Sequence, residues 1–373
     1  MPDRRGSPSD QVVVIGASAG GVEALRTVVA GLPADLPASV VVVLHVPRNS
    51  PGMLAGILDR AGPLPAAVAR HGSVLRPGAV HVAPPDHHVL VDDGRLVLST
   101  GPTENGHRPA VDPLFRSAAL ARGSAATGVV LSGTRDDGAA GLVSLVEHGG
   151  TALVQDPEEA LFAAMPRHAL ELVPEAVVLP SDRIAAALAA IVRAGPGRAD
   201  AAGRRAAARG GTARDHTSRD PTAHDDTARS EVEIARTGLP TTEGVPGARP
   251  SPFSCPQCHG VLFEVPGAPS PHMRCRIGHA WSPAGLEEEQ AAAVESALWT
   301  ALRALEERAA LLARLADGAR SAGRHNSAAL HAAHAAEIRE QAAHVRELLP
   351  RAVASVLTSD DGVGVGGIGA AGV

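Results

Sequence analysis

The chain has 373 residues, 45% of them hydrophobic, which suffices for roughly two or three domains with sizeable cores. Aromatic residues make up only 2% and tyrosine is absent, so these cores must consist of alanine, valine and leucine. The formal net charge of −6 argues against nucleic-acid binding, and the uncharged apolar stretches are too short to cross a bilayer. We therefore expect a cytoplasmic protein without membrane insertion.

Segments typical of strands and helices alternate along the first half of the chain. Strands are expected at 11–15, 39–44, 80–83, 127–132, 151–155 and 176–179, with a hairpin at 89–98 that turns at Asp93-Gly94. Helices are expected at 22–32, 52–61, 111–122, 139–147, 166–172 and 182–193. This alternation predicts an α/β domain over residues 1–194, with a doubly wound, mostly parallel sheet and helices on both faces.

A glycine-rich turn follows the first predicted strand and opens the first helix. It reads Gly-Ala-Ser-Ala-Gly-Gly and contains Ser18. A strand that ends in Gly-x-Ser-x-Gly and turns into a helix can hold a serine hydroxyl at the edge of a sheet. The first amides of that helix would face the same point, where their partial positive charge suits a developing oxyanion.

A histidine and a carboxylate follow the neighbouring predicted strands. His45 comes directly after the run 39–44, and Asp137 lies in the loop after the strand 127–132. Polar residues just past the carboxyl ends of parallel strands are where open α/β sheets collect their chemistry. We therefore predict a triad of Ser18, His45 and Asp137, since triads are defined by geometry and not by chain order.

Taken separately, each motif has an ordinary structural explanation. The turn at 16–21 could hold the phosphates of a dinucleotide, but that fold needs an acidic residue where this chain has His45. A single histidine is most often structural, and Asp136-Asp137-Gly138 is most often a turn or a helix cap. Their joint placement after consecutive buried strands favours catalysis.

Six motifs in one order resemble a known family. They are Gly16–Gly21, Leu44–Pro47, His81–Asp86, Arg108–Phe115, Leu131–Gly138 and Met165–Pro166. Together they resemble the catalytic domain of the chemotaxis protein-glutamate methylesterases, the CheB family, over roughly residues 10–193. Since only about ten residues precede the first strand, we expect a stand-alone form without the family's receiver domain.

The resemblance implies an enzyme that hydrolyses glutamate methyl esters on the cytoplasmic domains of chemoreceptors, without a catalytic cofactor. Deamidation of glutamine is a second implied reaction. The family's serine, histidine and aspartate fall on Ser18, His45 and Asp137. Thr134 and Arg135 replace a methionine and a glycine of the family's aspartate loop, so we expect the oxyanion to be held by the Ala19 amide and a donor near Thr134. Two alternatives stay open: an esterase for a methyl ester outside chemotaxis, and a non-catalytic interaction module.

A second signature lies beyond a polar stretch at 195–250, which we expect to be a disordered linker. Cys255, Cys258, Cys275 and His279 have the spacing of a tetrahedral Cys3His zinc site, and they include all three cysteines of the chain. Residues 251–284 are therefore predicted to form a small zinc-ribbon-like module with a closed, structural metal. A redox Cys-x-x-Cys is the competing interpretation, but it leaves Cys275 and His279 unexplained.

The sequence pattern of the C-terminal part of the chain predicts helices. Apolar residues recur at spacings of three and four over 286–315, glycines at 318 and 323 interrupt the pattern, and a second helix is expected over 328–349, ended by Pro350. Residues 285–355 should form a helical hairpin, with self-association or partner docking as the alternative. The tail 356–373 should be disordered.

Overall fold

The computed structural model of the chain describes residues 11–196, 221–237, 248–266 and 271–358. They belong to two compact units, Met1–Gly285 and Leu286–Val373. Across these described ranges, every helix is too short or too polar to cross a membrane.

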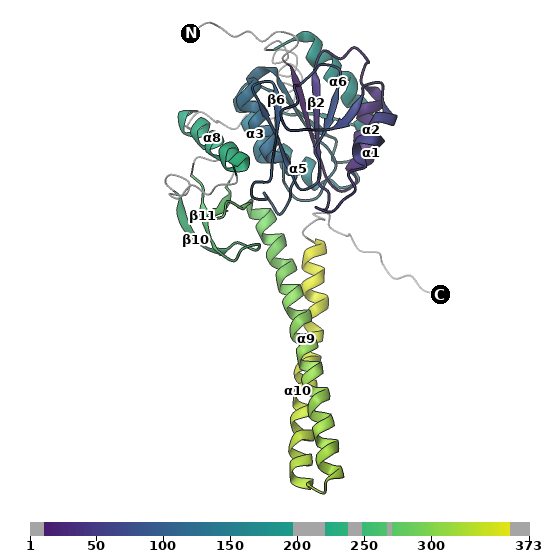
Figure 1. Cartoon of the computed structure of the whole chain (residues 1–373), viewed down its shortest axis with the longest axis vertical. Coiled ribbons are helices and arrows are strands. Elements are labelled where there is room, and N and C mark those ends of the chain that lie inside the picture. Colours follow the sequence, from purple (N-terminus) through teal and green to yellow (C-terminus); the bar gives the residue numbers. More distant parts are fainter. Residues whose placement is uncertain (1–10, 197–220, 238–247, 267–270, 359–373) are drawn as a thin grey trace, which may run out of the picture. The chain divides into compact units, whose positions relative to one another are not determined.

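A seven-stranded sheet forms the centre of the first unit (Figure 1). Its order is β3-β4-β2-β1-β7-β8-β9, and its neighbouring strands pair in parallel. The strands are β1 (Val12–Ala17), β2 (Ser39–Leu44), β3 (Ala66–Val68), β4 (Val80–Val82), β7 (Ala126–Val130), β8 (Thr151–Gln155) and β9 (Val177–Leu179). β1 and β2 are buried along their whole length, as the continuous valine runs of parallel strands predict.

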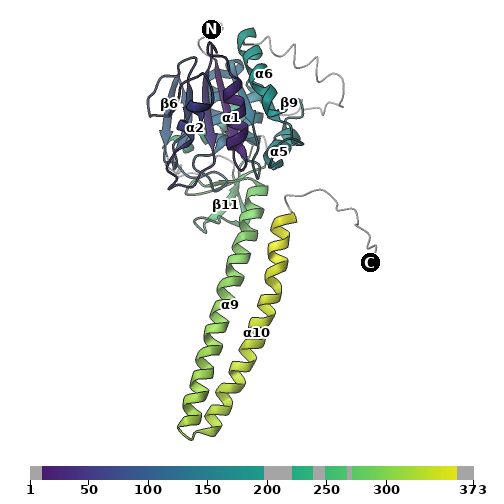
Figure 2. The same ribbon diagram turned by 90° about the vertical axis from the view of Figure 1, so that its right-hand side faces the viewer.

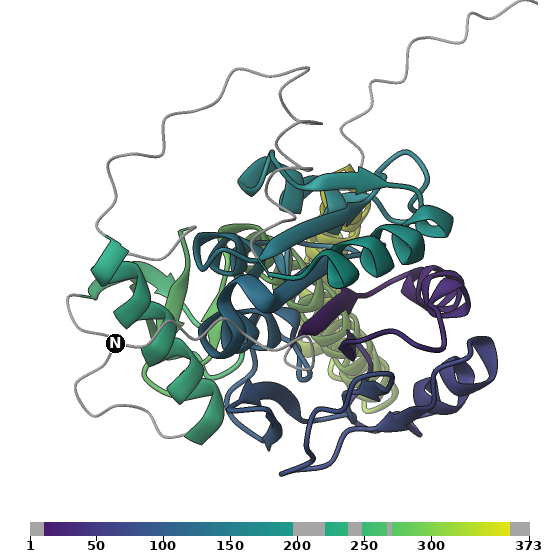
Figure 3. The ribbon, with the colours of Figure 1, turned by 90° about the horizontal axis from the view of Figure 1, so that it is seen from above.

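Helices cover both faces of this sheet (Figure 3). One face packs against α1 (Gly21–Gly31), α2 (Leu54–Ala61) and α6 (Ser181–Ala194). The other packs against α3 (Val111–Arg122), α4 (Ala139–Glu147), α5 (Ala164–Leu172) and the hairpin of β5 (His88–Asp92) and β6 (Arg95–Ser99). A short 3-10 helix, η2 (Gly123–Ala125), joins α3 to β7. The predicted doubly wound α/β fold is confirmed.

The strand order determines where a site can form. From β1 the chain builds one half of the sheet with β2, β4 and β3, and it then returns to the other side of β1 with β7, β8 and β9. The winding therefore reverses between β1 and β7. Ligands of open parallel sheets bind at the carboxyl ends of the strands at such a reversal.

A helix lies where the sequence analysis expects a disordered linker. α8 (Pro221–Thr237) packs beside α3 (Figure 1). Its buried residues include Ala228, Glu231 and Ala235, which recur at helical spacing. The stripe contains a buried glutamate, so it has no apolar periodicity to recognise. The rest of the expected linker, at 197–220 and 238–247, lies outside the described residues.

A small antiparallel sheet follows. Its strands are β10 (Arg249–Ser254), β11 (Val261–Glu264), β12 (Met273–Cys275) and β13 (Ala280–Trp281), hydrogen-bonded in that order. Asn105 donates its backbone N–H to the Ala280 carbonyl, and Ala280 donates its own to Thr103. These bonds tie the small sheet to the loop that precedes α3.

The C-terminal helices are α9 (Pro283–Ser321) and α10 (His325–Thr358), which run side by side as a hairpin (Figure 2). Leu302, Ala342 and Leu349 form its buried seam. Pro350 does not end the second helix, since a proline removes one N–H donor and the remaining bonds carry the helix onward. Residues 359–373 of the expected tail lie outside the described range, and association through these helices stays a prediction.

Candidate active site

Ser18 follows the last residue of β1, in the turn that leads to α1. Its N–H donates to the Ser132 carbonyl at 2.9 Å, which ties the turn to the loop after β7. Gly20 has φ +70°, and a Cβ there would lie 2.8 Å from Ser132 Oγ and 2.9 Å from Leu161 Cβ. The turn therefore requires glycine at this position for its conformation and its space.

His45 and Asp137 complete the arrangement that the sequence predicts. His45 Nδ1 lies 3.1 Å from Ser18 Oγ, and His45 Nε2 lies 2.7 Å from Asp137 Oδ2. The side chains of His45 and Asp137 are 4% and 0% exposed. Relative to the usual serine-protease arrangement the imidazole is turned over, with Nδ1 toward the serine and Nε2 toward the carboxylate. Either nitrogen can act as the base, so this geometry can activate a serine hydroxyl.

Asp137 is held by the N-terminus of α3. Its Oδ2 accepts the Val111 N–H at 2.7 Å, and its Oδ1 accepts the Asp112 N–H at 3.1 Å. Burial raises the pKa of Asp137, whereas these two N–H groups favour the ionised carboxylate and lower it. The free amides of a helix N-terminus thus stabilise the negative charge that orients His45.

The side chain of Asp112 in turn binds backbone groups that follow Asp137. Its Oδ1 accepts the N–H groups of Gly138 at 3.0 Å and Gly141 at 2.6 Å, at the start of α4. The catalytic loop is therefore fixed at both ends: α3 binds its aspartate, and a side chain of α3 caps the helix that follows it.

His107 was not singled out by the sequence analysis. Its ring stacks on the His45 ring with centroids 3.8 Å apart and planes 8° apart. Burial lowers the pKa of His107, with the charges of His45 and Arg135 as further causes, so both rings are neutral at neutral pH. The signal in the sequence is its place directly before the motif 108–115, in a loop that the triad prediction did not use.

Arg135 stands close to both histidines. Burial lowers the pKa of His45 to about 3, and the Arg135 charge is the second cause. Arg135 has φ +63°, the left-handed backbone that favours glycine, and glycine is what the resemblance expects there. Its Nη1 donates to the Asn105 carbonyl at 3.4 Å. The guanidinium therefore adds a positive charge at the site at some cost in backbone strain.

The residues expected to hold an oxyanion are Ala19, directly after Ser18, and Thr134, in the loop after β7. Ala19 and Thr134 are both half-buried. A Cβ on Gly133, the neighbour of Thr134, would lie 2.8 Å from Ser18 Cβ, so this loop passes directly against the serine. Their role in catalysis stays a prediction.

The four predicted metal ligands also come together. The three Sγ atoms and the His279 imidazole nitrogen lie within 4.8 Å of one another. Cys258 Sγ is 3.5 Å from Cys275 Sγ, and Cys255 Sγ is 3.6 Å from His279 Nδ1. Tetrahedral zinc with bonds of about 2.3 Å to sulfur and 2.0 Å to nitrogen separates its ligands by about 3.5–3.8 Å. The cluster thus fits zinc.

Two other histidines of this segment, His259 and His272, lie outside the four-residue cluster. His272 Nε2 instead lies 2.7 Å from a carboxylate oxygen of Glu231, and His259 is exposed.

Comparison with known proteins identifies the family of the first half of the chain. Residues 13–188 match the family model of the CheB methylesterase. The crystal structure of the Thermotoga maritima CheB methylesterase catalytic domain is 33% identical, and the match covers 98% of that chain and 48% of this one with a TM-score of 0.47. Residues 13–188 of the chain belong to the CheB methylesterase family.

Curated relatives of this CheB methylesterase domain carry double names. A protein-glutamate methylesterase/protein-glutamine glutaminase of Anaeromyxobacter dehalogenans is 43% identical over 188 residues, 50% of this chain and 55% of the relative. One from Pseudomonas aeruginosa is 41% identical over 184 residues, 48% of this chain and 52% of the relative. The chain thus spans about half the length of these relatives, and its second half lies beyond the matched CheB domain.

Proposed function

We propose that the protein is a protein-glutamate methylesterase that hydrolyses glutamate methyl esters on chemoreceptors. The observation that carries this proposal is the chain of contacts from Ser18 through His45 to Asp137 at the edge of the sheet. The double name of the relatives supports glutamine deamidation as a second reaction of the same site. Reduced cysteines and the chemoreceptor substrate favour a cytoplasmic location.

In the proposed mechanism, His45 takes the proton of Ser18 as the serine oxygen attacks the ester carbonyl. The negative oxygen of the tetrahedral intermediate accepts hydrogen bonds from the Ala19 amide and from a donor near Thr134, each worth about 3 kcal/mol of barrier. His45 then returns its proton to the leaving methoxide, and methanol departs. Water, deprotonated by His45, hydrolyses the acyl-serine and releases the glutamate carboxylate, while Asp137 stabilises the imidazolium in both halves.

Methanol release from a methylated chemoreceptor tests this proposal. Ser18→Ala should abolish almost all of it, by a factor of about a thousand or more, with the fold unchanged by circular dichroism. A fluorophosphonate should label the parent protein at Ser18. Full turnover in the variant would contradict the serine mechanism, and an unlabelled parent would favour a non-catalytic module. Methanol release from other methylated proteins but not from chemoreceptors would contradict the proposed substrate.

For the second half of the first unit, we propose that Cys255, Cys258, Cys275 and His279 hold one structural Zn²⁺. Their close approach supports it, as does the hydrogen bond from Trp281 Nε1 to Cys255 Sγ at 3.4 Å, because such bonds orient and stabilise a thiolate ligand. Elemental analysis of the purified chain should give about one zinc per chain, and Cys258→Ser should lower it. A chain purified without metal that still folds fully would contradict the site.

A further inference from the structure

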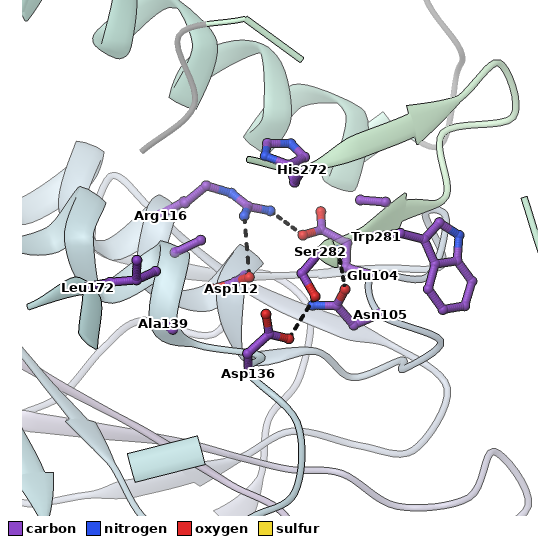
Figure 4. A pocket seen from close by; sticks show the side chains of 12 residues that line it. Glu104, Asn105, Asp112, Arg116, Asp136, Ala139, Leu172, His272, Trp281 and Ser282 are labelled. Carbon is purple, nitrogen blue, oxygen red and sulfur yellow. Dashed lines mark hydrogen bonds and ion pairs between the residues drawn. The ribbon is translucent and has the colours of Figure 1, made fainter. Parts of the chain in front are cut away.

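Four buried charged side chains meet between α3, α8 and the small sheet. They are Glu104, Arg116, Glu231 and Arg274, each at most 6% exposed (Figure 4 shows Glu104 and Arg116). Arg274 Nη2 lies 3.0 Å from Glu231 Oε1 and 3.2 Å from Glu104 Oε1. Arg116 bonds Glu104 and lies 3.5 Å from Glu231 Oε2. A buried charge without its partners is strongly destabilising, so these residues must be present together.

The carboxylates of this cluster are ionised. Burial alone raises the pKa of Glu231, but the positive charges of His272, Arg274 and Arg116 outweigh it and lower that pKa well below its usual value. Burial likewise raises the pKa of Glu104, and Arg116 with Arg274 reverses the shift. Arg274, from the small sheet, is thus the cation that acts on both carboxylates beside Arg116.

On one side the cluster leads to the catalytic aspartate. Arg116 Nη1 lies 3.9 Å from Asp112 Oδ2, and Asp112 caps the helix after Asp137 while its N–H binds the Asp137 carboxylate. A second contact reaches the same loop, since Ser282 Oγ donates to Asp136 Oδ1 at 2.7 Å (Figure 4). Asp112 and Ser282 thus both bind the loop that presents Asp137 to His45.

On the other side the cluster leads to the cysteines. Arg274 directly precedes Cys275, and its Nη1 donates to the Gly278 carbonyl at 2.5 Å, within the turn between Cys275 and His279. Ser282 directly follows Trp281, whose indole donates to Cys255 Sγ. The two side chains that reach the catalytic domain are therefore held by the segments that hold the candidate metal ligands.

We propose that Arg274 and Ser282 are positioning residues of the esterase, and that metal binding by the Cys3His cluster sets the catalytic loop through them. The inference rests on the proposed esterase and the proposed metal site, and it goes beyond a structural metal. Small metal-binding modules of this kind order their loops only when loaded. In the loaded chain Arg274 completes the buried cluster and Ser282 holds Asp136. In the stripped chain both contacts loosen, and Asp137 orients His45 less well.

The test compares full-length protein in three states: metal-loaded, stripped with a chelator, and reloaded with Zn²⁺. A small neutral ester serves as substrate, because it contacts only the triad and its turnover reports chemistry. We expect stripping to lower kcat about 10- to 100-fold, the range seen when residues that orient catalytic or metal-binding groups are lost, with KM nearly unchanged. Reloading should restore kcat. An unchanged kcat in stripped protein that has lost its metal would overturn the inference.

Variants separate positioning from folding. Ser282→Ala leaves every buried charge in place, so we expect kcat to fall about 3- to 10-fold with KM unchanged. The Ser282 hydroxyl also accepts the Gly285 N–H at the start of α9, so a small fall in the unfolding temperature should accompany the change. Arg274→Lys keeps the positive charge, so it should retain a higher kcat than Arg274→Gln. Arg276→Gln is the matched control, since Arg276 lies in the same turn but is exposed. Equal kcat in Ser282→Ala and the parent would count against a positioning role.

The outcomes also separate this inference from the functions on which it rests. Hydrolysis that persists in Ser18→Ala would defeat the proposed esterase itself. A chain purified without zinc would defeat the metal site and the coupling together. If zinc-loaded protein hydrolyses the ester through Ser18 and its kcat does not change when the metal is removed, the proposed function stands. Only the proposed link between the metal and the catalytic loop would then be wrong.

Discussion

Arg135 is the charged residue that shifts the pKa of the candidate base, His45. Its charge lowers the pKa of His45, second only to burial. A general base acts only when neutral, so a lowered pKa keeps His45 active as the pH falls through the ordinary histidine range near about 6.5. The acid limb of kcat/KM should therefore lie below that value.

Arg135→Gly should raise the pKa of His45 and shift that acid limb to higher pH, because a positive charge near the imidazolium is removed. It should also relieve the left-handed backbone at this position, which costs a non-glycine residue about 1 kcal/mol. Arg183→Gln is the control, since that side chain is 74% exposed. Superimposable pH profiles of Arg135→Gly and the parent would contradict this account.

The stacked ring of His107 should contribute to the rate by holding the His45 ring in its plane. Its replacement by alanine should lower kcat about two- to tenfold, since aromatic pairs contribute about 0.5–1.5 kcal/mol beyond burial. His107→Phe preserves the stack and should stay close to the parent. Pre-steady-state acylation rates measure both. An alanine variant as fast as the phenylalanine variant would show that stacking does not position His45.

At the scale of elements, much of the first half of the chain can be predicted from local pattern. Valine runs and polar residues at their ends locate β1, β2 and the positions of Ser18 and His45. The pattern does not reveal β3, which is short and partly exposed. Nor does it reveal α8, because the buried stripe of this helix contains Glu231. That charge can be buried because Arg116, His272 and Arg274, far away in sequence, meet it.

The contact between α3 and α4 gives an element-scale prediction. A Cβ at Gly141 would lie 2.7 Å from Phe115 Cβ and 2.9 Å from Asp112 Oδ1. Gly141→Ala should therefore push the two helices apart, destabilise the protein by about 1–3 kcal/mol and lower kcat through Asp112. Gly318→Ala in α9 is the matched control, because a Cβ there meets nothing within 4 Å. Urea unfolding of both variants measures the difference, and equal midpoints would contradict the predicted clash.

At the scale of the molecule, the site draws on parts of the chain that are far apart in sequence. The triad, the buried charge cluster and the Cys3His cluster all lie within Met1–Gly285, whereas α9 and α10 form a second unit with its own seam. The CheB family match ends at residue 188, so it contains the triad but not Glu231, Arg274 or the cysteines. A fragment that stops at the family boundary should therefore keep the Arg116–Glu104 pair but lack the further partners of these two side chains, Glu231 and Arg274.

Two truncations compare these boundaries. A chain ending at Gln290 keeps every charged partner of α3, so we expect its turnover of a small ester to stay within about twofold of the full chain. A chain ending at Ala194 loses the ion pairs of Arg116 with Glu231 and of Glu104 with Arg274, and it uncovers the surface of α3 that α8 buries, so it should be less stable and slower in kcat. Urea unfolding measures the stability of both truncations, and ester kinetics measure their kcat. A shorter chain as stable and fast as the longer one would mean that α8 and the small sheet contribute nothing to the esterase, whereas a strong loss in the longer one would assign part of the activity to the helical hairpin.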